Sequence, residues 1–571
     1  MLTLRLTLTD CTGEGELPEP PPPPPPQAAK TKGANNTTSK NFLNVNSPKL
    51  NRDASMPELY NFSAQRENIM RILLLLIFAS ASITHSIEIS TPQGKLLGML
   101  SDRSTEVAVF KHIPFAKPPV GARRWTYAEP ADSWTGVRDA TRFGPACMQK
   151  GYPEGSFFSR PSDPTSEDCL HLNVWSSMPS NEKLPVMVWI HGGALTRGTG
   201  VGTVYDGTEL AKKGVVLVTI NYRLGVFGYL AHPELSKESK SSGNYGTSDQ
   251  IEALRWVKAN ISAFGGDPEN VTIFGESAGS WSVNHLVASP KAAGLFHRAI
   301  GQSGGSFRKL PELTQGERPA ETRGMSFQKI LKASSIDHMR DIDASEILAA
   351  DDGRSYRGIV DGQFIPDQIY RLFEQGQFNR VPVMLGYNAE EGTTLGALRV
   401  LPKNEKAYVA GIKQRFDKNA GRFLELYPKD KVRDSFLHLS SDSGFGWNMH
   451  YWAAQSAKHN VNAYMYYFTH RPLGDELAAY HAAEIVFAFN NVRHAQMFDN
   501  PINRKLAEEI SDYWVQFASA GDPSQEGSVT WPTYAQKGKA YVELGTNGAA
   551  AGVGLMNRKF ELFESIYSKE R

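Results

Sequence analysis

The sequence predicts an α/β protein with a large, mostly parallel central sheet and helices on both faces. Apolar runs at 184–190, 215–220 and 271–274 have the length and β-branched content of buried strands. An amphipathic stretch at 249–264 and a helix-like stretch at 506–518 alternate with such runs, as in βαβ units. The chain has 571 residues, a length that one large α/β sheet with its helices can occupy as a single unit.

A serine framed by glycines stands where the strand at 271–274 is predicted to end. Gly275, Ser277 and Gly279 form a G-x-S-x-G pattern, and residues 280–287 are predicted to form a helix. A tight strand-to-helix turn holds its central residue in a strained conformation, and small neighbours relieve the crowding. We therefore expect an exposed serine hydroxyl at a helix N-terminus. A glycine-rich turn with an ordinary surface serine is the alternative.

A second glycine-rich segment follows the strand at 184–190. Gly192, Gly193 and Ala194 leave room for a bound group to approach the main chain. A serine hydroxyl becomes an effective nucleophile only when a base takes its proton and N–H donors stabilise the resulting oxyanion. The N–H groups of Gly193, Ala194 and Ala278 are therefore predicted to form an oxyanion hole with three donors.

Several longer strings resemble a known family. Residues 166–174 and 274–279 are similar to two signatures of the type-B carboxylesterases, which also include the cholinesterases and the neuroligins. Residues 221–225 and 243–246 are similarly characteristic. The sequence at 299–305, among other places, is most similar to the bacterial branch.

The resemblance implies an α/β-hydrolase fold and hydrolysis of carboxylic esters through an acyl-enzyme on Ser277. It extends from about residue 87 to the C-terminus. The polar stretch at 309–356 is expected to form insertion helices over the active site. Short to medium acyl esters and xenobiotic esters are both compatible substrates.

The resemblance also implies an acid and a histidine after the serine. Glu391 stands where the family has its acid, with the adjacent Glu390 as the competing candidate. His481 begins a string that is similar to the family's base motif, although Ala482 replaces the usual glycine. In the expected mechanism His481 takes the proton of Ser277, and Glu391 fixes the tautomer and balances the imidazolium.

Three other side chains near these motifs have alternative interpretations. His285 lies about two helical turns from the serine and is predicted to be a packing or surface residue. His191 is expected to shape the oxyanion loop. By resemblance Glu276 lies near the site and makes the electrostatic potential there more negative. A buried carboxylate paired with an arginine is the other interpretation of Glu276.

The cysteines indicate an oxidising compartment. By resemblance Cys147 and Cys169 form a disulfide, and two free buried thiols are the alternative.

Between Cys147 and Cys169 stand Tyr152, Phe157 and Phe158 but no tryptophan. Cholinesterases hold a quaternary ammonium group against a tryptophan in this loop, so the sequence argues against choline specificity.

The N-terminal segment differs from the rest in composition. Residues 1–69 contain a proline run at 20–26 and a polar continuation, which predicts disorder. Residues 70–86 have the start methionine, positive charge, short apolar core and A-x-A site of a signal peptide. We expect translation to begin at Met70, with the hydrolase domain at 87–571 in a secreted or periplasmic protein. A cytoplasmic tail with an uncleaved anchor is the alternative.

Composition excludes several function classes. The net charge is +1, and the globular part has no basic block, so neither nucleic acid nor an acidic membrane is an expected partner. No Cys/His cluster has metal-ligand spacing, and a serine hydrolase needs no cofactor. The expected partner is a small-molecule ester, without a stable membrane anchor. The rival hypotheses are a non-catalytic, neuroligin-like binding homologue and, within the same fold, a cholinesterase or a lipase.

Overall fold

The computed structural model describes residues 86–152, 156–158, 164–177, 183–351, 356–535 and 538–571. The predicted extension at 1–69 and the predicted signal peptide at 70–86 lie outside the described residues, apart from Ser86.

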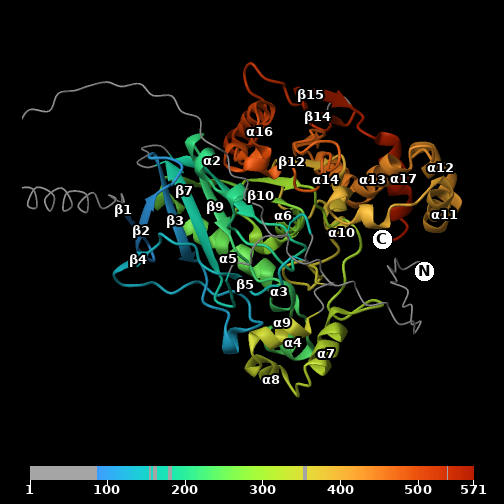
Figure 1. The fold of residues 1–571 in the computed structure, drawn as a ribbon. Helices are drawn as coiled ribbons and strands as arrows, with labels where there is room; N and C mark the ends of the chain where they lie inside the picture. Colours follow the sequence, from blue (N-terminus) through green and yellow to red (C-terminus); the bar gives the residue numbers. More distant parts are fainter. Residues whose placement is uncertain (1–85, 153–155, 159–163, 178–182, 352–355, 536–537) are drawn as a thin grey trace, which may run out of the picture. The chain divides into compact units, whose positions relative to one another are not determined.

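A 13-stranded sheet forms the centre of the described part of the chain (Figure 1). Its strands follow one another in space in the order β1 (Ser86–Thr91), β2 (Gly94–Leu100), β3 (Val107–Pro114), β7 (His171–Ser177), β9 (Val216–Ile220), β8 (Leu184–Ile190), β10 (Gly266–Glu276), β11 (Arg298–Gln302), β12 (Val383–Asn388), β13 (Ala463–Phe468), β14 (Ala540–Gly545) and β15 (Gly548–Val553), and β4 (Val137–Asp139) pairs with β2. A second, small sheet contains β5 (Ala146–Cys147) and β6 (Thr165–Ser166).

The sheet is mixed, so the expectation of a mostly parallel sheet is met only in part. Neighbouring strands from β9 through β14 run parallel. In contrast, β1, β2, β3 and β7 pair antiparallel in succession, and β15 pairs antiparallel with β14. Tight hairpins join β1 to β2 and β14 to β15, and a hairpin always makes its strands antiparallel. The apolar runs that predicted the sheet belong to β8, β9 and β10, which all lie in its parallel part.

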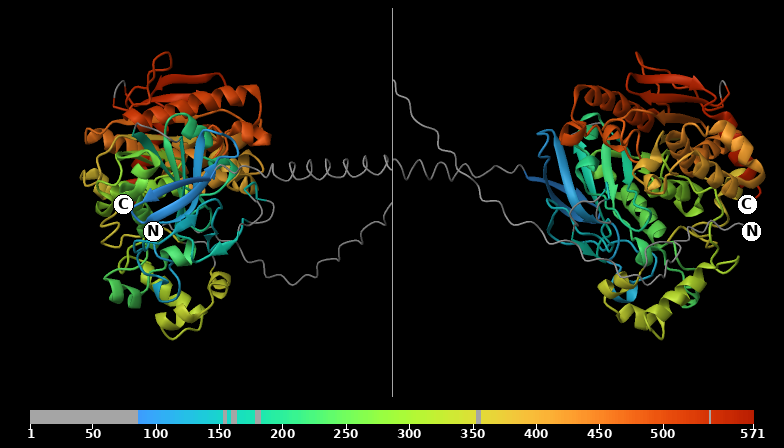
Figure 2. Two further views of the ribbon diagram at one scale, coloured as in Figure 1. Left: turned by 90° about the vertical axis from the view of Figure 1, so that its left-hand side faces the viewer. Right: turned by 45° about the vertical axis from the view of Figure 1, so that its right-hand side comes forward.

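Helices cover both faces of the parallel strands, as expected. On one face lie α5 (Tyr245–Asn260), α6 (Ala278–Ala288) and α14 (Trp447–Lys458), and on the other lie α2 (Thr208–Lys212) and α16 (Pro501–Ala520). In Figure 2, α16, β14 and β15, in orange to red, lie together at one end of the sheet, where β14 and β15 form its edge. The other α-helices of the described residues are α3 (Gly225–Tyr229), α4 (Pro233–Ser239), α7 (Ala320–Ile330), α8 (Ile336–Asp341), α9 (Ala344–Ala350), α10 (Ile369–Glu374), α11 (Glu405–Phe416), α12 (Ala420–Leu426), α13 (Val432–Ser441), α15 (Ile485–Ala488) and α17 (Asn557–Tyr567).

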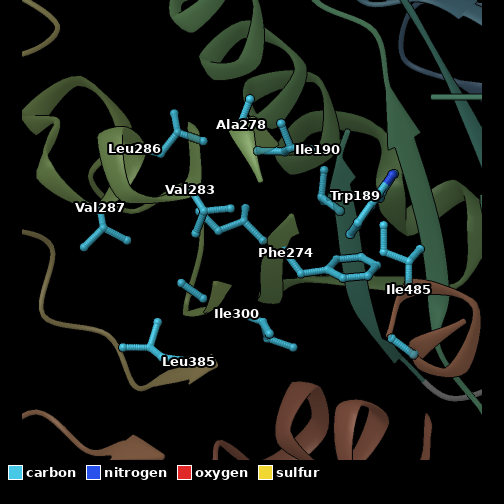
Figure 3. Close-up of a cluster of buried hydrophobic side chains, with 14 of the residues drawn as sticks. Trp189, Ile190, Phe274, Ala278, Val283, Leu286, Val287, Ile300, Leu385 and Ile485 are labelled. Carbon is cyan, nitrogen blue, oxygen red and sulfur yellow. The ribbon is translucent and has the colours of Figure 1, made fainter. Parts of the chain in front are cut away.

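Apolar side chains fix α6 to the sheet (Figure 3). Val283, Leu286 and Val287 of this helix lie in one buried cluster with Ile300 of β11 and Leu385 of β12. Burying a side chain of this size contributes about 1.5–3 kcal/mol. The cluster therefore holds the N-terminus of α6, where Ser277 stands, at a fixed place above the strand ends.

The region around the disulfide is fixed by covalent and ionic contacts. Cys147 and Cys169 are bonded, as the resemblance implied. Arg124 donates two hydrogen bonds to the carboxylate of Glu167 inside this loop, both at 2.6 Å. The same guanidinium donates to the carbonyl groups of Met339, Arg340 and Ile342. The insertion at 309–356 forms α7, α8 and α9, and Arg124 joins the end of α8 to the disulfide loop.

Within the described ranges, no helix combines the length and the apolar composition that crossing a bilayer requires.

Loss of the disulfide is expected to destabilise the protein measurably. The two cysteines are 22 residues apart, and loop entropy for this length predicts a loss of about 3 kcal/mol in the Cys147→Ala/Cys169→Ala variant. Denaturant unfolding measures this loss. Dithiothreitol should destabilise the wild type similarly and leave the double variant unchanged. Equal stability of both proteins under oxidising conditions would contradict the expectation.

Candidate active site

Ser277 occupies a strained turn between β10 and α6. Its backbone has φ 57° and ψ −121°, a conformation that a non-glycine residue rarely adopts. Its main-chain N–H donates to the carbonyl of Gln302 at the end of β11, at 2.8 Å. A Cβ on Gly279 would lie 2.0 Å from the carbonyl oxygen of Ile190. The G-x-S-x-G pattern therefore reflects close contact between backbones, as the sequence predicted.

The loop after β8 passes directly beside the serine. A Cβ on Gly192 would lie 3.2 Å from the Cβ of Ser277. Gly193 and Ala194 both have positive φ, at 108° and 58°. The main-chain N–H groups of Gly193, Ala194 and Ala278 donate to no protein acceptor in the described part of the chain. The proposed oxyanion hole thus consists of N–H groups that stand near the serine and are available to a ligand.

His481 is held by a buried carboxylate. Its Nδ1 lies 2.6 Å from Oε2 of Glu391, which is fully buried in η5 (Glu391–Thr393), a single 3-10 turn after β12. The other oxygen of this carboxylate accepts the main-chain N–H of Asn388 at 2.8 Å. The imidazole is therefore attached, through one carboxylate, to the end of a central strand.

The adjacent Glu390 points elsewhere. Its carboxylate accepts the N–H of Ala479 and pairs with Arg471 and His438. Burial opposes the ionisation of Glu390, but the contacts with His438, Ala479 and Arg471 outweigh it and lower the pKa of this carboxyl. Of the two candidate acids, Glu391 is therefore the one in contact with His481.

The second nitrogen of His481 faces the end of β10. Its Nε2 lies 3.1 Å from Oε1 of Glu276, the residue that precedes the serine. Ser277 and His481 make no hydrogen bond with each other in the described structure. Hydrogen bonds between catalytic groups are often formed only once substrate is bound. The geometry brings the imidazole to the strand end that carries the serine, with Glu276 as its immediate neighbour.

Glu276 pairs with this histidine and not with an arginine, which corrects one of the two interpretations of its role. Burial raises the pKa of Glu276 well above its ordinary value, and the nearby carboxylates of Glu484 and Glu391 raise it further. Burial lowers the pKa of His481, but Glu276 and Glu391 outweigh this effect and raise it. Two groups with raised pKa values therefore lie next to each other at the end of β10.

A third buried glutamate, Glu484, belongs to this cluster and has no assigned role in the sequence motifs. Its oxygens accept hydrogen bonds from Gln302 at 3.1 Å and from Asn388 at 2.6 Å. Burial, followed by the charge of Glu391, raises its pKa. The available sequence signal is a carboxylate three residues after His481, followed at once by the apolar run 485–489.

The register of the sheet explains why these groups meet. Glu276 pairs with Gln302 across β10 and β11, and Gln302 pairs with Gly386 across β11 and β12. Asn388, two residues after Gly386, therefore ends near the same edge. Since carboxyl ends of parallel strands share one edge of a sheet, the loops that follow them converge there.

His285 and His191, the two other histidines considered in the sequence analysis, have structural contacts. His285 is buried on α6, and its Nε2 lies 2.9 Å from the hydroxyl of Ser306, in agreement with a packing role. The ring of His191 stacks on Tyr222 at 4.5 Å, directly before the oxyanion loop. Among the described residues no group of three or more His, Cys, Asp or Glu side chains has an arrangement that would hold a metal ion.

Comparison with known proteins identifies the family. The model of the carboxylesterase family matches residues 85–563. A fumonisin B1 esterase from Sphingopyxis macrogoltabida is 36% identical over 487 residues, which cover 82% of this chain and 88% of the relative. A para-nitrobenzyl esterase from Bacillus subtilis is 35% identical over 79% of this chain and 93% of the relative. A human cocaine esterase is 34% identical over 83% and 90%.

These matches extend over most of the chain and of each relative, and two of the three relatives are bacterial, in agreement with the resemblance in the sequence. The chain belongs to the carboxylesterase family and is a carboxylic ester hydrolase.

Proposed function

We propose that Ser277 is the nucleophile, that His481 is the general base and that Glu391 orients and charge-balances the histidine. The observation that carries this proposal is the 2.6 Å contact between Glu391 and His481, with Nε2 directed at the strand end that precedes Ser277. The strained backbone of Ser277 supports it, because such strain is concentrated at functional sites.

In the proposed reaction, His481 takes the hydroxyl proton as Ser277 attacks the ester carbonyl. The oxyanion of the tetrahedral intermediate accepts hydrogen bonds from the N–H groups of Gly193, Ala194 and Ala278. His481 then protonates the departing alcohol, which leaves an acyl group on Ser277. Water, deprotonated by the same histidine, attacks the acyl-enzyme and releases the acid. These residues require no cofactor.

Short to medium acyl esters and xenobiotic esters are the proposed substrates. Aromatic side chains stand near the histidine: Phe157 lies 4.9 Å, between ring centroids, from Tyr480, the residue directly before His481. Such surfaces suit apolar groups of a small ester. Esterase relatives at 33–36% identity favour catalysis over a neuroligin-like binding role.

We further propose that the protein is exported and that the mature chain begins after residue 86. The disulfide between Cys147 and Cys169 supports this proposal, because disulfides persist in oxidising compartments.

Hydrolysis of p-nitrophenyl esters from acetate to palmitate tests the nucleophile and the acyl preference. We expect turnover to fall with chain length. Ser277→Ala should lower kcat by about 10⁶-fold, because the acyl-enzyme has no other site. Ser326→Ala, at an exposed position of α7, serves as the control and should retain full activity. Wild-type rates in Ser277→Ala would refute the assignment of the nucleophile.

Glutamine substitutions at the two adjacent glutamates distinguish the candidate acids. Glu391→Gln should lower kcat by about 10⁴-fold, because a neutral amide neither fixes the tautomer nor balances the imidazolium. Glu390→Gln should cost less than about tenfold, since its contacts are to Ala479, Arg471 and His438. A larger loss in Glu390→Gln than in Glu391→Gln would reverse the assignment.

The pH profile of kcat/KM tests the influence of Glu276. Activity requires the neutral imidazole, so a raised pKa of His481 places the acidic limb above the ordinary value of about 6.5. Glu276→Gln removes one carboxylate, lowers the pKa of His481 and should move the limb to lower pH by about one unit or more. Glu269→Gln, an exposed site on the same strand, is the control. An unchanged limb in Glu276→Gln would contradict the expectation.

A further inference from the structure

One aromatic side chain lies against the ring of His481. The ring centroids of Phe445 and His481 are 4.9 Å apart, with an angle of 38° between the planes. Glu391 and Glu276 contact the two nitrogens of the imidazole. Phe445 differs from these two carboxylates because it places an aromatic ring beside the imidazole ring. Phe445 is half-buried and packs against the core.

Phe445 is presented by an unusual backbone element. It belongs to a π-helical turn, Asp442–Gly446, that interrupts the helical path between α13 and α14. Such turns are rare and occur frequently at functional sites. A π-turn holds one residue more than an α-helical turn, and that residue turns the following side chains by about 100° around the helix axis. The direction of Phe445 therefore depends on this turn.

The turn is fixed at both ends. The buried carboxylate of Asp442 accepts the hydroxyl of Tyr427 at 2.8 Å and pairs with Lys559 of α17 at 3.0 Å. At the other end, a Cβ on Gly446 would lie 2.8 Å from the ring of Tyr387, so this residue packs tightly on β12. The anchors leave Phe445 little freedom to move away from the imidazole.

The same helical segment also touches the loop of the proposed acid. A Cβ on Gly392, the residue after Glu391, would lie 3.3 Å from the hydroxyl oxygen of Ser440 in α13. The path from α13 through the π-turn thus contacts the segment of Glu391 and the ring of His481. One element supports both members of the pair.

An aromatic ring at this distance favours a positive charge on its neighbour. A cation within about 6 Å of a ring centroid is attracted by the electron-rich face. The imidazole becomes an imidazolium when it takes the proton of the serine. The ring of Phe445 also occupies space into which the imidazole would otherwise turn.

We propose that Phe445 is a positioning residue: its ring holds His481 in its productive orientation and stabilises the imidazolium that forms during ester hydrolysis. The proposal rests on the proposed role of His481 as the base. Phe445 then acts through the histidine and needs no contact with the reacting atoms.

Phe445→Leu, which keeps apolar bulk and removes the aromatic face, is the test variant. With p-nitrophenyl acetate we expect kcat to fall by about two- to thirtyfold, with KM within twofold of the wild-type value. The pKa of His481 should also fall, which moves the acidic limb of kcat/KM to lower pH. The charged groups around His481, namely Glu276 of β10, Glu391 of η5 and Glu484 beside α15, remain in place. Phe445→Tyr should restore both properties.

Phe378→Leu is the matched control. Phe378 is also half-buried and also lies beside a histidine, His459, at 5.8 Å between ring centroids. This variant loses a similar aromatic contact away from the proposed site, so kcat and the acidic limb should stay at wild-type values. A fall in Phe445→Leu no larger than that in Phe378→Leu would overturn the proposal. So would a rise in KM with unchanged kcat and limb, because that result assigns Phe445 to substrate binding.

A measurement without substrate separates this proposal from the proposed function. The ¹H NMR signal of the Nδ1–H proton between His481 and Glu391 reports the titration of the imidazole directly. A lower titration midpoint in Phe445→Leu than in wild type supports the positioning role, whether or not any ester is hydrolysed. An absence of ester hydrolysis would count against the catalytic role of His481 and not against the positioning role of Phe445. Identical titrations in both proteins would overturn the positioning role even in an active esterase.

Discussion

The contact between Glu391 and His481 is the interaction on which the rest of the site depends. A buried imidazole without a charged partner is neutral and free to turn, because burial opposes its protonation. The carboxylate of Glu391, 2.6 Å from Nδ1, fixes that nitrogen and leaves Nε2 to face the end of β10. The carboxylate is itself held by the N–H of Asn388. The orientation of the proposed base is therefore set by the main chain at the end of β12.

Parallel pairing is what assembles the site from distant parts of the chain. The oxyanion loop follows β8, Ser277 follows β10, Glu391 follows β12, and His481 comes after β13. These strands all belong to the parallel part of the sheet, whose carboxyl ends share one edge. The antiparallel strands extend the sheet on both sides but supply none of the proposed catalytic residues. The proposed site therefore lies at the parallel part of the sheet, and the strands at the two edges only extend the sheet.

The strain at Ser277 is compatible with a stable fold because the packing around it is extensive. A residue in such a backbone region costs about 1–3 kcal/mol. Each large side chain buried between α6 and the sheet contributes a similar amount, and Val283, Leu286 and Val287 are all buried there. Burial also has a cost for the carboxylates near His481, since it raises the pKa of Glu276 and Glu484. Hydrogen bonds from Gln302 and Asn388 offset part of the cost of burying Glu484.

The sequence by itself determined the features that arise from local sterics and patterning. The runs at 184–190 and 215–220 form β8 and β9, because short apolar runs rich in β-branched residues suit strands that are buried on both faces. The glycines around Ser277 indicated a tight elbow, because a Cβ at these positions would collide with neighbouring backbone. The resemblance to a family supplied Glu391, His481 and the disulfide, for which local patterns alone give no signal.

Only the tertiary structure decided which side chains meet. It separates Glu391 from Glu390, brings Glu276 to the histidine, and adds Glu484 and Phe445 to its surroundings. It also adds antiparallel pairs towards both edges of the sheet, which the strand runs did not indicate. Glu391 and His481 are 90 residues apart, and the direction of each side chain depends on the turn that carries it. Local sequence patterns do not encode such contacts, because they arise from strand register and from the packing of elements that are remote in the chain.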